Sequence, residues 1–457
     1  MPNVGGRPVG RSRPIGAGSC HMASSLSETS ASVGLAGPRT AFPIAPDAET
    51  RRMLCRWHGE YGAVYRVPDT RGGPDHWVVH DPRLVRQVLV KRGADYEKGR
   101  GLDRVRLLLG EGIMVSEGAF WARQRRLMQP AFRPRALADF NAMMLAENRA
   151  LAERWAAAAT GGAAVDVAAH ISELTLVIVL KSIFGRDYEA LVAAHGNPFA
   201  LLTETPERDL RFAARFHRLA GVVAAVVERR RAAPRPAFDF LGHMLAARSR
   251  TGASMSTRAL IDEVMTLIVA GHETTASVLA WAWYLIATHE DVCARARAEA
   301  DAVDEAALGT RGPGADLPFI GRVIDETLRL YPPGWLLSRR ARVDTDLGAH
   351  RLPAGSQVFI SPYVLHRHDA HWRDPQRFDP ARFARDDEPG HRFAFVPFAA
   401  GPRHCVGEHM ARTEMGMHLA VMLRRFTPRY AGEAPPAMES RINLRPAAGI
   451  YLQLTQR

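Results

Sequence analysis

The sequence predicts a mainly α-helical protein with a small β portion. Apolar residues recur with helical spacing over most of the chain between residues 81 and 330. The segments with the alternating pattern of strands are short and lie on either side of this helical stretch. The composition is typical of a globular protein, with 47% hydrophobic and 24% charged residues. No linker-like shift or repeat follows residue 45, so we expect one domain over residues 45–457.

Five segments have the spacing of amphipathic or buried helices. They cover residues 135–159, 168–184, 208–232, 257–288 and 408–425. The segment 257–288 is the longest, and at about 1.5 Å per residue it extends about 48 Å. A helix of this length can cross a whole domain.

The expected strands are few. Residues 63–67 and 76–79 read as a hairpin, and residues 344–353, 357–360 and 450–454 as further strands. Residues 366–400 are rich in Pro, Arg and His and are expected to be irregular.

Residues 1–44 are expected to form a disordered leader, because they are rich in Gly, Pro, Ser and Arg and show no periodicity. Within them, Gly18–Met22 resembles a cloning scar. The leader lacks the apolar core of a signal peptide. Four scattered cysteines fit a reducing compartment, and no apolar stretch reaches the roughly 18 residues of a spanning helix. We therefore expect a cytoplasmic monomer with no membrane span.

The charge pattern and the missing motifs exclude several classes. The formal net charge is +12, yet no Lys/Arg run with interleaved aromatic residues supports a nucleic-acid partner. No G-x-G-x-x-G follows a strand, and no P-loop, G-x-S-x-G or H-E-x-x-H is present. The sequence therefore lacks the usual motifs of dinucleotide-dependent dehydrogenases, P-loop NTPases, serine hydrolases and zincins.

The most specific motif is the segment Phe398–Gly407, which fits F-x-x-G-x-R-x-C-x-G. A cysteine thiolate that binds haem iron needs an open loop with backbone N–H groups directed at its sulfur. Gly401 and Gly407 let the backbone approach a porphyrin closely. Arg403 offers a forked donor for a carboxylate. Taken alone, Cys405 would be a buried structural cysteine, but within this loop it is a candidate metal ligand.

With this loop, the chain from about residue 45 to its end resembles the cytochrome P-450 family of haem-thiolate monooxygenases. The resemblance implies the P-450 fold, a single triangular helical domain around a haem b, with Cys405 as the iron ligand. Ala399 departs from the family pattern, which more often has Ser, Gly, Asn or His at this position. We read this departure as a small packing difference.

The segment Ala270–Thr275 lies within the long expected helix. A Gly in the middle of a helix weakens the i→i−4 backbone hydrogen bonds. A Thr hydroxyl can donate a hydrogen bond to a backbone carbonyl instead and so open a local bulge. In the resembling family, Thr274 would hold iron-bound dioxygen and Glu273 would relay protons, an acid–alcohol pair suited to dioxygen cleavage. The alternative is an ordinary helix interior with a satisfied Thr and a solvent-facing Glu. His272 is read as structural.

An E-x-x-R pair, Glu326 and Arg329, lies on an expected helix that runs into a proline-rich segment. The segment Phe378–Phe383 resembles the family's P-E-R-F element and contributes Arg382. The resemblance implies a buried ion network of Glu326, Arg329 and Arg382 that supports folding and haem retention. A surface i,i+3 pair is the alternative.

Further residues are assigned to the haem propionates by the resemblance. Trp121 and Arg125 are spaced i,i+4 on one expected helix, and the indole N–H and the guanidinium both suit a carboxylate. They are assigned to one propionate, and Arg339 to a propionate from the strand side. Arg403 is the remaining cofactor-binding candidate.

The resemblance implies an enzyme that inserts one oxygen atom from dioxygen into a C–H bond of its substrate. Since no flavin or iron–sulfur segment is recognisable, electrons are expected from a separate ferredoxin or flavodoxin with its reductase. Such donors are usually acidic, and Arg123, Arg126 and Arg403 are candidates for the docking face. The alternatives are a peroxide-using peroxygenase or isomerase of the same fold, and a non-enzymatic haem sensor.

The expected substrate is a lipophilic small molecule of secondary metabolism, such as a terpenoid, fatty acid or polyketide, because the candidate pocket segments are mostly apolar. Arg104 and Arg106 are candidates for binding the carboxylate of an organic acid, so an acidic substrate is a further possibility. The alternative for both is a solvated charge on the surface. The loop 104–115 and Met265 are also pocket candidates. The remaining candidates are Val269, Ala270, Gly334, Trp335, Leu336, Leu337 and Ile450. For Trp335, a position in the hydrophobic core is the alternative.

Overall fold

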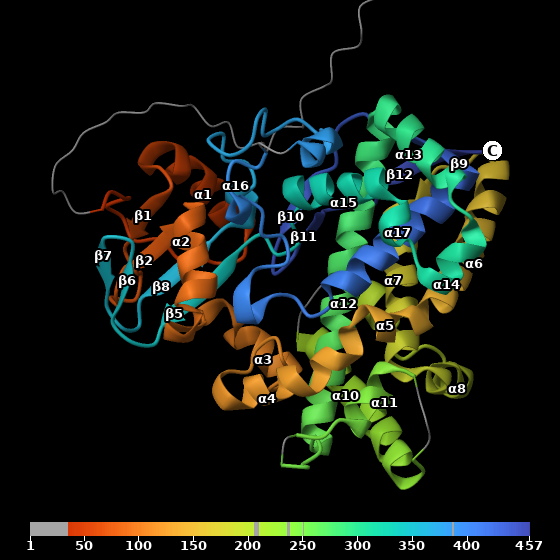
Figure 1. The fold of residues 1–457 in the computed structure, drawn as a ribbon, viewed down its shortest axis with the longest axis horizontal. Helices are drawn as coiled ribbons and strands as arrows, with labels where there is room; N and C mark the ends of the chain where they lie inside the picture. The colour runs from red at the N-terminus through yellow and green to blue at the C-terminus, as the bar shows by residue number, and fades with distance from the viewer. Residues whose placement is uncertain (1–34, 205–209, 235–237, 250, 386–387) are drawn as a thin grey trace, which may run out of the picture.

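In the computed structural model, residues 35–204, 210–234, 238–249, 251–385 and 388–457 are described. Helices dominate the fold, and the largest sheet lies on the left-hand side of Figure 1. The prediction of a mainly α-helical fold with a small β portion is therefore confirmed.

The largest sheet joins strands from both halves of the chain. Its order is β1 (Val64–Val67), β2 (His76–Val79), β8 (Gln357–Ile360), β5 (Leu337–Ala341) and β3 (Tyr96–Lys98). The expected β1–β2 hairpin is present, and β8 adds to it in parallel beside β2. The helices α1 (Ala48–Tyr61) and α2 (Pro82–Arg86) lie beside this sheet (Figure 1).

The remaining strands form smaller sheets. The single strand expected over residues 344–353 is a hairpin of β6 (Thr345–Leu347) and β7 (His350–Leu352), because the chain reverses at Gly348 with φ +60°. Five strands were not predicted, each short or without clear alternation: β3, β4 (Val165–Asp166), β5, β10 (Met438–Ser440) and β11 (Leu444–Pro446). A further unpredicted strand, β9 (Phe426–Tyr430), pairs with β12 (Tyr451–Gln456), which also pairs with β4.

The long helix α12 (Thr257–Thr288) has the predicted bounds and runs through the helical part of the molecule (Figure 1). It begins where the Ser256 side chain accepts a hydrogen bond from the N–H of Ala259, a favoured N-cap arrangement. Most of α12 is buried, yet Ala270 at mid-helix is exposed. This middle part therefore faces a hollow inside the fold.

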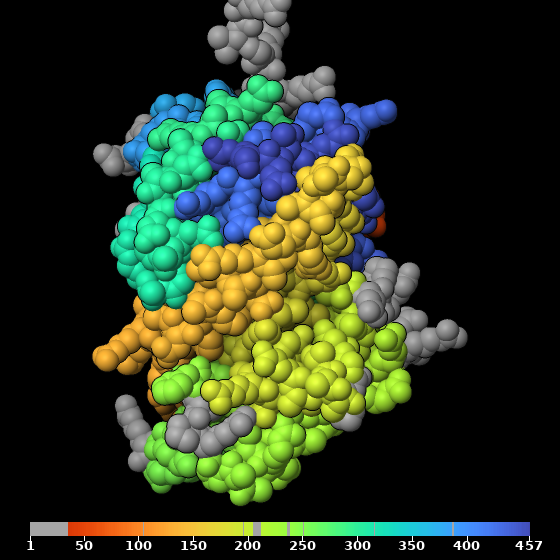
Figure 2. Space-filling view, turned by 90° about the vertical axis from the view of Figure 1, so that its right-hand side faces the viewer, coloured from red at the N-terminus to blue at the C-terminus, as the bar shows by residue number. Residues whose placement is uncertain are grey.

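Several helices surround α12. They are α6 (Asn141–Thr160), α7 (Val167–Phe184), α10 (Leu210–Ala232), α15 (Pro318–Leu330) and α17 (Glu408–Arg425). Figure 2 shows this helical side, where the C-terminal strands in dark blue lie beside the orange-yellow helix α6. The other helices are α3 (Asp103–Leu109), α4 (Gly118–Met128), α5 (Pro134–Leu137), α8 (Arg186–His195), α9 (Leu201–Glu204), α11 (Phe240–Ala246), α13 (Glu290–Ala302), α14 (Glu305–Arg311) and α16 (Pro362–Leu365).

Two boundaries differ from the prediction. The helix expected over 135–159 begins only at Asn141, after α5 and a short 3₁₀ turn. At the N-terminus, residues 1–34 of the expected leader lie outside the described residues. Phe42, which the leader was expected to include, packs edge-to-face on Trp57 with ring centroids 5.2 Å apart. The packed body therefore starts before residue 45.

Among the described residues, α7 is long and apolar enough to cross a membrane by length and composition alone. The sequence analysis did not identify it as such. Most of this helix is buried, and it packs against α12. Its apolar character is accounted for by its place in the core.

Candidate active site

The cysteine loop lies between a 3₁₀ turn, Gly401–Arg403, and the first residue of α17. The backbone N–H of Cys405 donates to the carbonyl of Phe398 over 3.0 Å, which closes the loop. Gly401 has φ +70°, and a Cβ at this position would overlap the carbonyl oxygen of Leu89. Only glycine can occupy this turn without moving the neighbouring backbone.

The surroundings of the Cys405 sulfur act on its charge in opposite directions. The side chain is accessible to solvent, yet the protein encloses it closely enough that burial raises the pKa of the thiol. The backbone N–H groups of Gly407 and Glu408 hydrogen-bond to the sulfur and favour the thiolate, as does Arg125. Two directed N–H groups at a helix start suit a metal-bound thiolate, which a bound cation would keep deprotonated.

The space beside the cysteine is open. A Cβ added to Gly407 would meet no heavy atom within 4 Å, so this side of the loop is open. Arg125 on α4 is near enough to Cys405 for the sulfur to raise its pKa, against a larger lowering by burial. The thiol, an open backbone and an arginine thus border the same space.

Ala399 adopts φ +58°, a left-handed conformation that L-residues with a Cβ rarely take. The departure from the family pattern noted in the sequence is therefore a matter of backbone conformation rather than only of packing. The residue holds this conformation while its N–H donates to the carbonyl of Val396 over 3.1 Å.

A cluster of cations lies beside the loop, in which Arg339 is buried and Lys98 and Arg403 are partly buried. Lys98 on β3 pairs with Arg339 on β5 in the antiparallel register. The pKa of Lys98 is lowered to about 7, mainly by burial and further by the nearby charges of Arg339 and Arg403. Burial likewise lowers the pKa of Arg339 to about 10, again helped by Arg403. Glu117 is the one carboxylate that opposes these effects.

Arg403 is already engaged by protein groups. It forms an ion pair with Glu117 and donates to the carbonyl of Ser116 over 2.9 Å. Its guanidinium also stacks over the Trp121 ring at 3.8 Å. Lys98 and Arg339, by contrast, form no ion pair among the described residues, and Arg339 donates to the carbonyl of Ser338 over 2.8 Å. A surplus of buried and partly buried positive charge beside the cysteine fits a cofactor with two carboxylates, as haem has.

The sequence analysis did not find Lys98, because the short strand β3 has no recognisable pattern. One signal was available, since lysine occurs only three times in a chain with 60 basic residues. The structure brings Arg339, Arg403 and Trp121 together around it, in the region where propionates were predicted.

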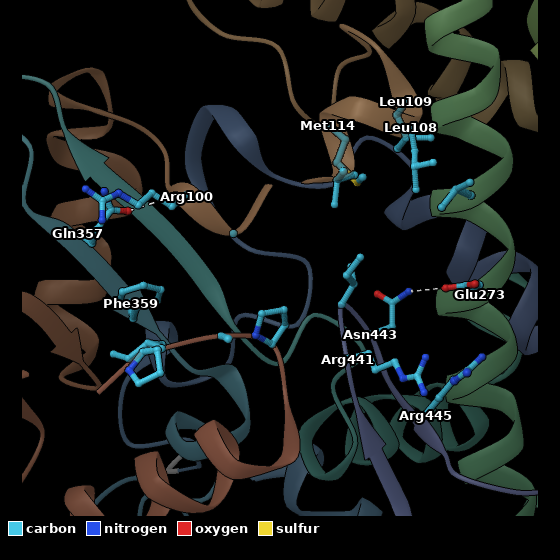
Figure 3. Close-up of a pocket in the computed structure, with 18 of the residues that line it drawn as sticks. Arg100, Leu108, Leu109, Met114, Glu273, Gln357, Phe359, Arg441, Asn443 and Arg445 are labelled. Carbon is cyan, nitrogen blue, oxygen red and sulfur yellow. Dashed lines mark hydrogen bonds between the residues drawn. The ribbon is translucent and has the colours of Figure 1, made fainter. Parts of the chain in front are cut away.

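The Ala270–Thr275 segment keeps its helical form. The Thr274 hydroxyl donates to the carbonyl of Ala270 over 2.8 Å, as expected from the sequence. The expected bulge is absent, because α12 is an uninterrupted α-helix through these residues. Glu273 accepts a hydrogen bond from the Asn443 amide over 3.0 Å (Figure 3). His272 is buried and contacts Ser172 over 2.9 Å, in agreement with a structural role.

A cavity of about 580 Å³ lies beside the middle of α12, where Val269 and Glu273 line it. Val105, Leu108, Leu109 and Met114 give it an apolar wall, and Glu273 lies at its edge (Figure 3). The other contributors come from segments that the sequence analysis did not connect with the pocket. They include residues 43–46 before α1, Gln357 and Phe359 on β8, and residues 441–443 and 445 in the β10–β11 region.

The predicted pocket residues are only partly at this cavity. Val269 lines it, whereas Met265, Trp335 and Ile450 are buried core residues. The Trp335 indole donates to the carbonyl of Arg441 over 2.7 Å, which fixes it away from the cavity. The remaining candidates Ala270, Gly334, Leu336 and Leu337 do not line the cavity either.

Neither of the two arginines considered for binding an acidic substrate is seen at the cavity. Arg106 donates to the carbonyl of Val115 over 2.8 Å and lies 3.4 Å from Glu111. It is absent from the cavity wall. The side chain of Arg104 lies outside the described residues.

Glu326, Arg329 and Arg382 lie together in the interior. Arg329 binds Glu326 through two bonds of 2.6 and 2.8 Å, and Arg382 donates to the same carboxylate over 3.0 Å. Arg329 also donates to the carbonyls of His366 and Pro375, which belong to the irregular stretch before the cysteine loop. All three charged side chains are essentially inaccessible to solvent. The surface-pair alternative is therefore excluded for this motif.

Comparison with known proteins gives the family. The cytochrome P450 family model matches residues 41–454. Cyclooctatin synthase of Streptomyces melanosporofaciens is 34% identical, with 76% of this chain and 79% of the relative aligned. Pentalenene oxygenase of Streptomyces avermitilis is 30% identical over 81% of this chain and 84% of its own.

A solved structure also supports membership of this family. The crystal structure of a cytochrome P450, CYP102L1, matches with a TM-score of 0.77 and 26% identity, over 89% of this chain and 94% of that chain. The chain therefore belongs to the cytochrome P450 family and is a P450 monooxygenase.

Proposed function

We propose that this monooxygenase binds haem b, which Cys405 would hold as the iron ligand and Lys98, Arg125, Arg339 and Trp121 would hold through its propionates. The observation that carries this proposal is the surplus of buried and partly buried cations beside the accessible cysteine. When bound, haem supplies the redox chemistry that activates dioxygen. The protein's own residues orient the substrate and deliver protons.

Glu273 and Thr274 are the proposed proton-handling residues. Oxygen insertion consumes dioxygen, two electrons and two protons, and releases one water for each hydroxylated product. The Glu273 carboxylate is held at the cavity edge by the Asn443 amide, in a position to take protons from solvent. The Thr274 hydroxyl, one residue further along α12, supplies a short-range donor.

The proposed substrate is a lipophilic small molecule, and among the three classes considered a terpenoid hydrocarbon is favoured. The cavity wall is mainly apolar, with Leu108, Leu109, Met114 and Val269 contributing to it. Two relatives are named for the oxidation of hydrocarbons, pentalenene and carotene. A role in secondary metabolism follows from such a substrate.

The electrons are proposed to come from a cytoplasmic ferredoxin or flavodoxin with its reductase. Arg126 on α4 is exposed and available to an acidic partner, whereas Arg123 donates to the Ser254 carbonyl. Arg403 is paired with Glu117, so we remove it from the proposed docking face. Arg126→Glu should slow electron transfer and weaken its salt dependence; unchanged rates would contradict this docking face.

The proposed activity is tested with purified, haem-loaded protein, a panel of sesquiterpenes, fatty acids and macrolactones, and a surrogate ferredoxin and reductase. A spin-state shift with sesquiterpenes and a hydroxylated product that contains ¹⁸O from labelled dioxygen would support the proposal. Product with hydrogen peroxide but none with reductant and dioxygen would instead make the protein a peroxygenase. No product under either condition with any panel member would contradict the proposed substrate classes.

A further inference from the structure

A cavity-bordering loop, Gly110–Met114, is fastened to α12 by two consecutive carboxylates. The N–H of Glu111 donates to Asp262 over 2.9 Å, and the N–H of Ile113 donates to Glu263 over 2.8 Å. The two carboxylates belong to α12, within the two turns that precede the exposed mid-helix region. Both side chains are buried, and Glu263 is fully so.

Glu263 also connects a third segment. Its second oxygen accepts a hydrogen bond over 3.1 Å from the side-chain amide of Gln124, which lies buried on α4. One carboxylate thus joins the loop, α4 and α12. Asp262 is held in place by Arg258, one turn earlier on α12, at 3.1 Å.

Two glycines allow the loop to lie directly against the helix. Gly110 has φ +62°, and a Cβ there would overlap the Asp262 carboxylate. A Cβ on Gly112 would overlap the Thr266 hydroxyl and lie 2.7 Å from the Asp262 carbonyl oxygen. No side chain can therefore stand between the loop and α12, and the spacing is fixed by backbone contact.

The position of the loop bears on the shape of the cavity. Leu108 and Leu109 precede it and Met114 ends it, and all three line the cavity near α12 (Figure 3). Val269 lies two turns beyond Glu263 on the same helix and also lines it. A change in the distance between the loop and α12 would therefore move one cavity wall.

The carboxylate at Glu263 is not explained by an ion pair. Among the described residues, no cation lies within ion-pair distance of it, and its two bonds come from neutral amides. Burial raises its pKa to about 7, against the opposing effect of these two donors and with a smaller contribution from Asp262. A hydrophobic residue would pack here at lower cost. The carboxylate contributes two acceptor atoms in one place, which is what two N–H groups require.

We propose that Asp262 and Glu263 are specificity-determining positioning residues, which hold the Gly110–Met114 loop against α12 and so set the size of substrate that the cavity admits. The inference rests on the proposed function only in taking this cavity as the substrate site. It concerns the attachment of the loop, which can be measured without turnover.

The first test is hydrogen–deuterium exchange of the haem-loaded protein, read over residues 110–116. Glu263→Gln leaves one acceptor oxygen for two donors, and Asp262→Asn weakens the Glu111 contact. Glu414→Gln is the matched control, because Glu414 is another buried glutamate with a raised pKa and contacts no part of the loop. We expect about tenfold faster exchange of the loop in both test variants and no change in the control. Unchanged exchange in both test variants would overturn the proposal.

The second test is optical titration with two haem-binding probes of different size, imidazole and clotrimazole. The ratio of their dissociation constants should change at least threefold in Glu263→Gln, with imidazole affinity preserved. An unchanged ratio would show that the loop does not set cavity size. Gly112→Ala, which pushes the loop from α12 while both carboxylates remain, should shift the ratio as well and replaces Glu263→Gln if that variant does not fold.

These outcomes are separable from failure of the proposed function. If wild-type protein binds haem and both probes but oxidises no panel substrate, the proposed substrate fails while the loop inference stands. If oxidation is found but neither the loop exchange nor the probe ratio responds, the loop inference fails alone.

Discussion

Lys98 and Arg339 lie directly opposite each other on β3 and β5, where Arg339 is buried and Lys98 is partly buried. Like charges at opposite positions destabilise a strand pair, and burial increases the cost. Since Glu117 is shared with Arg403, the pair has too little negative charge around it. The arrangement becomes favourable when carboxylates of a bound group lie beside it.

Lys98→Met should therefore have opposite effects on the two forms of the protein. Without haem, the variant should be at least as stable as wild type, because a buried repulsion is removed. With haem, it should lose the cofactor about ten- to a hundredfold faster, since one charge-assisted hydrogen bond is lost. Haem transfer to apomyoglobin measures the rate. Lys91→Met, at an exposed position, is the control, and equal rates for the two variants would contradict the propionate assignment.

The same lysine predicts a pH dependence for the haem-free protein. The folded pKa of Lys98, about 7, is below its ordinary value of 10.5. The unfolded chain therefore binds more protons between these values, and the free energy of unfolding should rise as pH increases from about 7 to about 10.5. Urea unfolding at several pH values measures this trend. Lys98→Met should flatten it, and a slope retained in the variant would assign the effect to another group.

Ala399→Gly should stabilise the folded protein by about 0.5–1 kcal/mol. The residue is strained at φ +58°, and glycine takes this conformation freely, although it also increases the entropy of the unfolded chain. Ala400, with φ −156°, is unstrained, so Ala400→Gly should destabilise instead. Denaturant unfolding compares the two. A destabilised Ala399→Gly would show that the left-handed conformation is not a source of strain.

Glu326→Gln should destabilise the protein by about 3–5 kcal/mol, because it leaves two buried arginines without their shared anion. Glu60→Gln serves as the control, since Glu60 forms an exposed pair with Arg56 and should cost less than about 1 kcal/mol. The free energy of unfolding in guanidinium chloride measures both. Comparable small effects would show that the buried network contributes little to stability.

Thr274→Val and Glu273→Gln should lower the yield of product per electron consumed and raise the release of hydrogen peroxide, because proton delivery is impaired. Thr274→Ser keeps the hydroxyl and should restore coupling. The ratio of product to consumed NAD(P)H, with peroxide assayed in parallel, measures the effect. Full coupling in Thr274→Val would remove Thr274 from proton handling.

The parts predicted well from the sequence are local. The bounds of α12 and α17 follow from apolar periodicity, and the cysteine loop and the Glu326–Arg329 pair lie within short motifs. The parts that were missed depend on long-range assembly. Lys98 acquires its role only because β3 pairs with β5, 241 residues apart at the Lys98–Arg339 position. No local pattern reports such a contact.

The cavity illustrates the same limit. Trp335 was expected at the pocket as part of the apolar segment Gly334–Leu337, with a core position as the alternative, yet its indole donates to the Arg441 carbonyl and the residue is buried in the core. Asn443, which holds Glu273, belongs to a short hairpin without sequence alternation. Composition predicts that a pocket is apolar, but which residues line it depends on the packing of segments from both ends of the chain.

The most direct test of the account is the absorption spectrum of the dithionite-reduced protein with and without carbon monoxide. Thiolate ligation through Cys405 predicts a strongly red-shifted Soret band with carbon monoxide, which Cys405→Ser should abolish. A Soret band typical of histidine-ligated haem, or well-folded protein that binds no haem, would contradict the assignment of Cys405 and the function that depends on it.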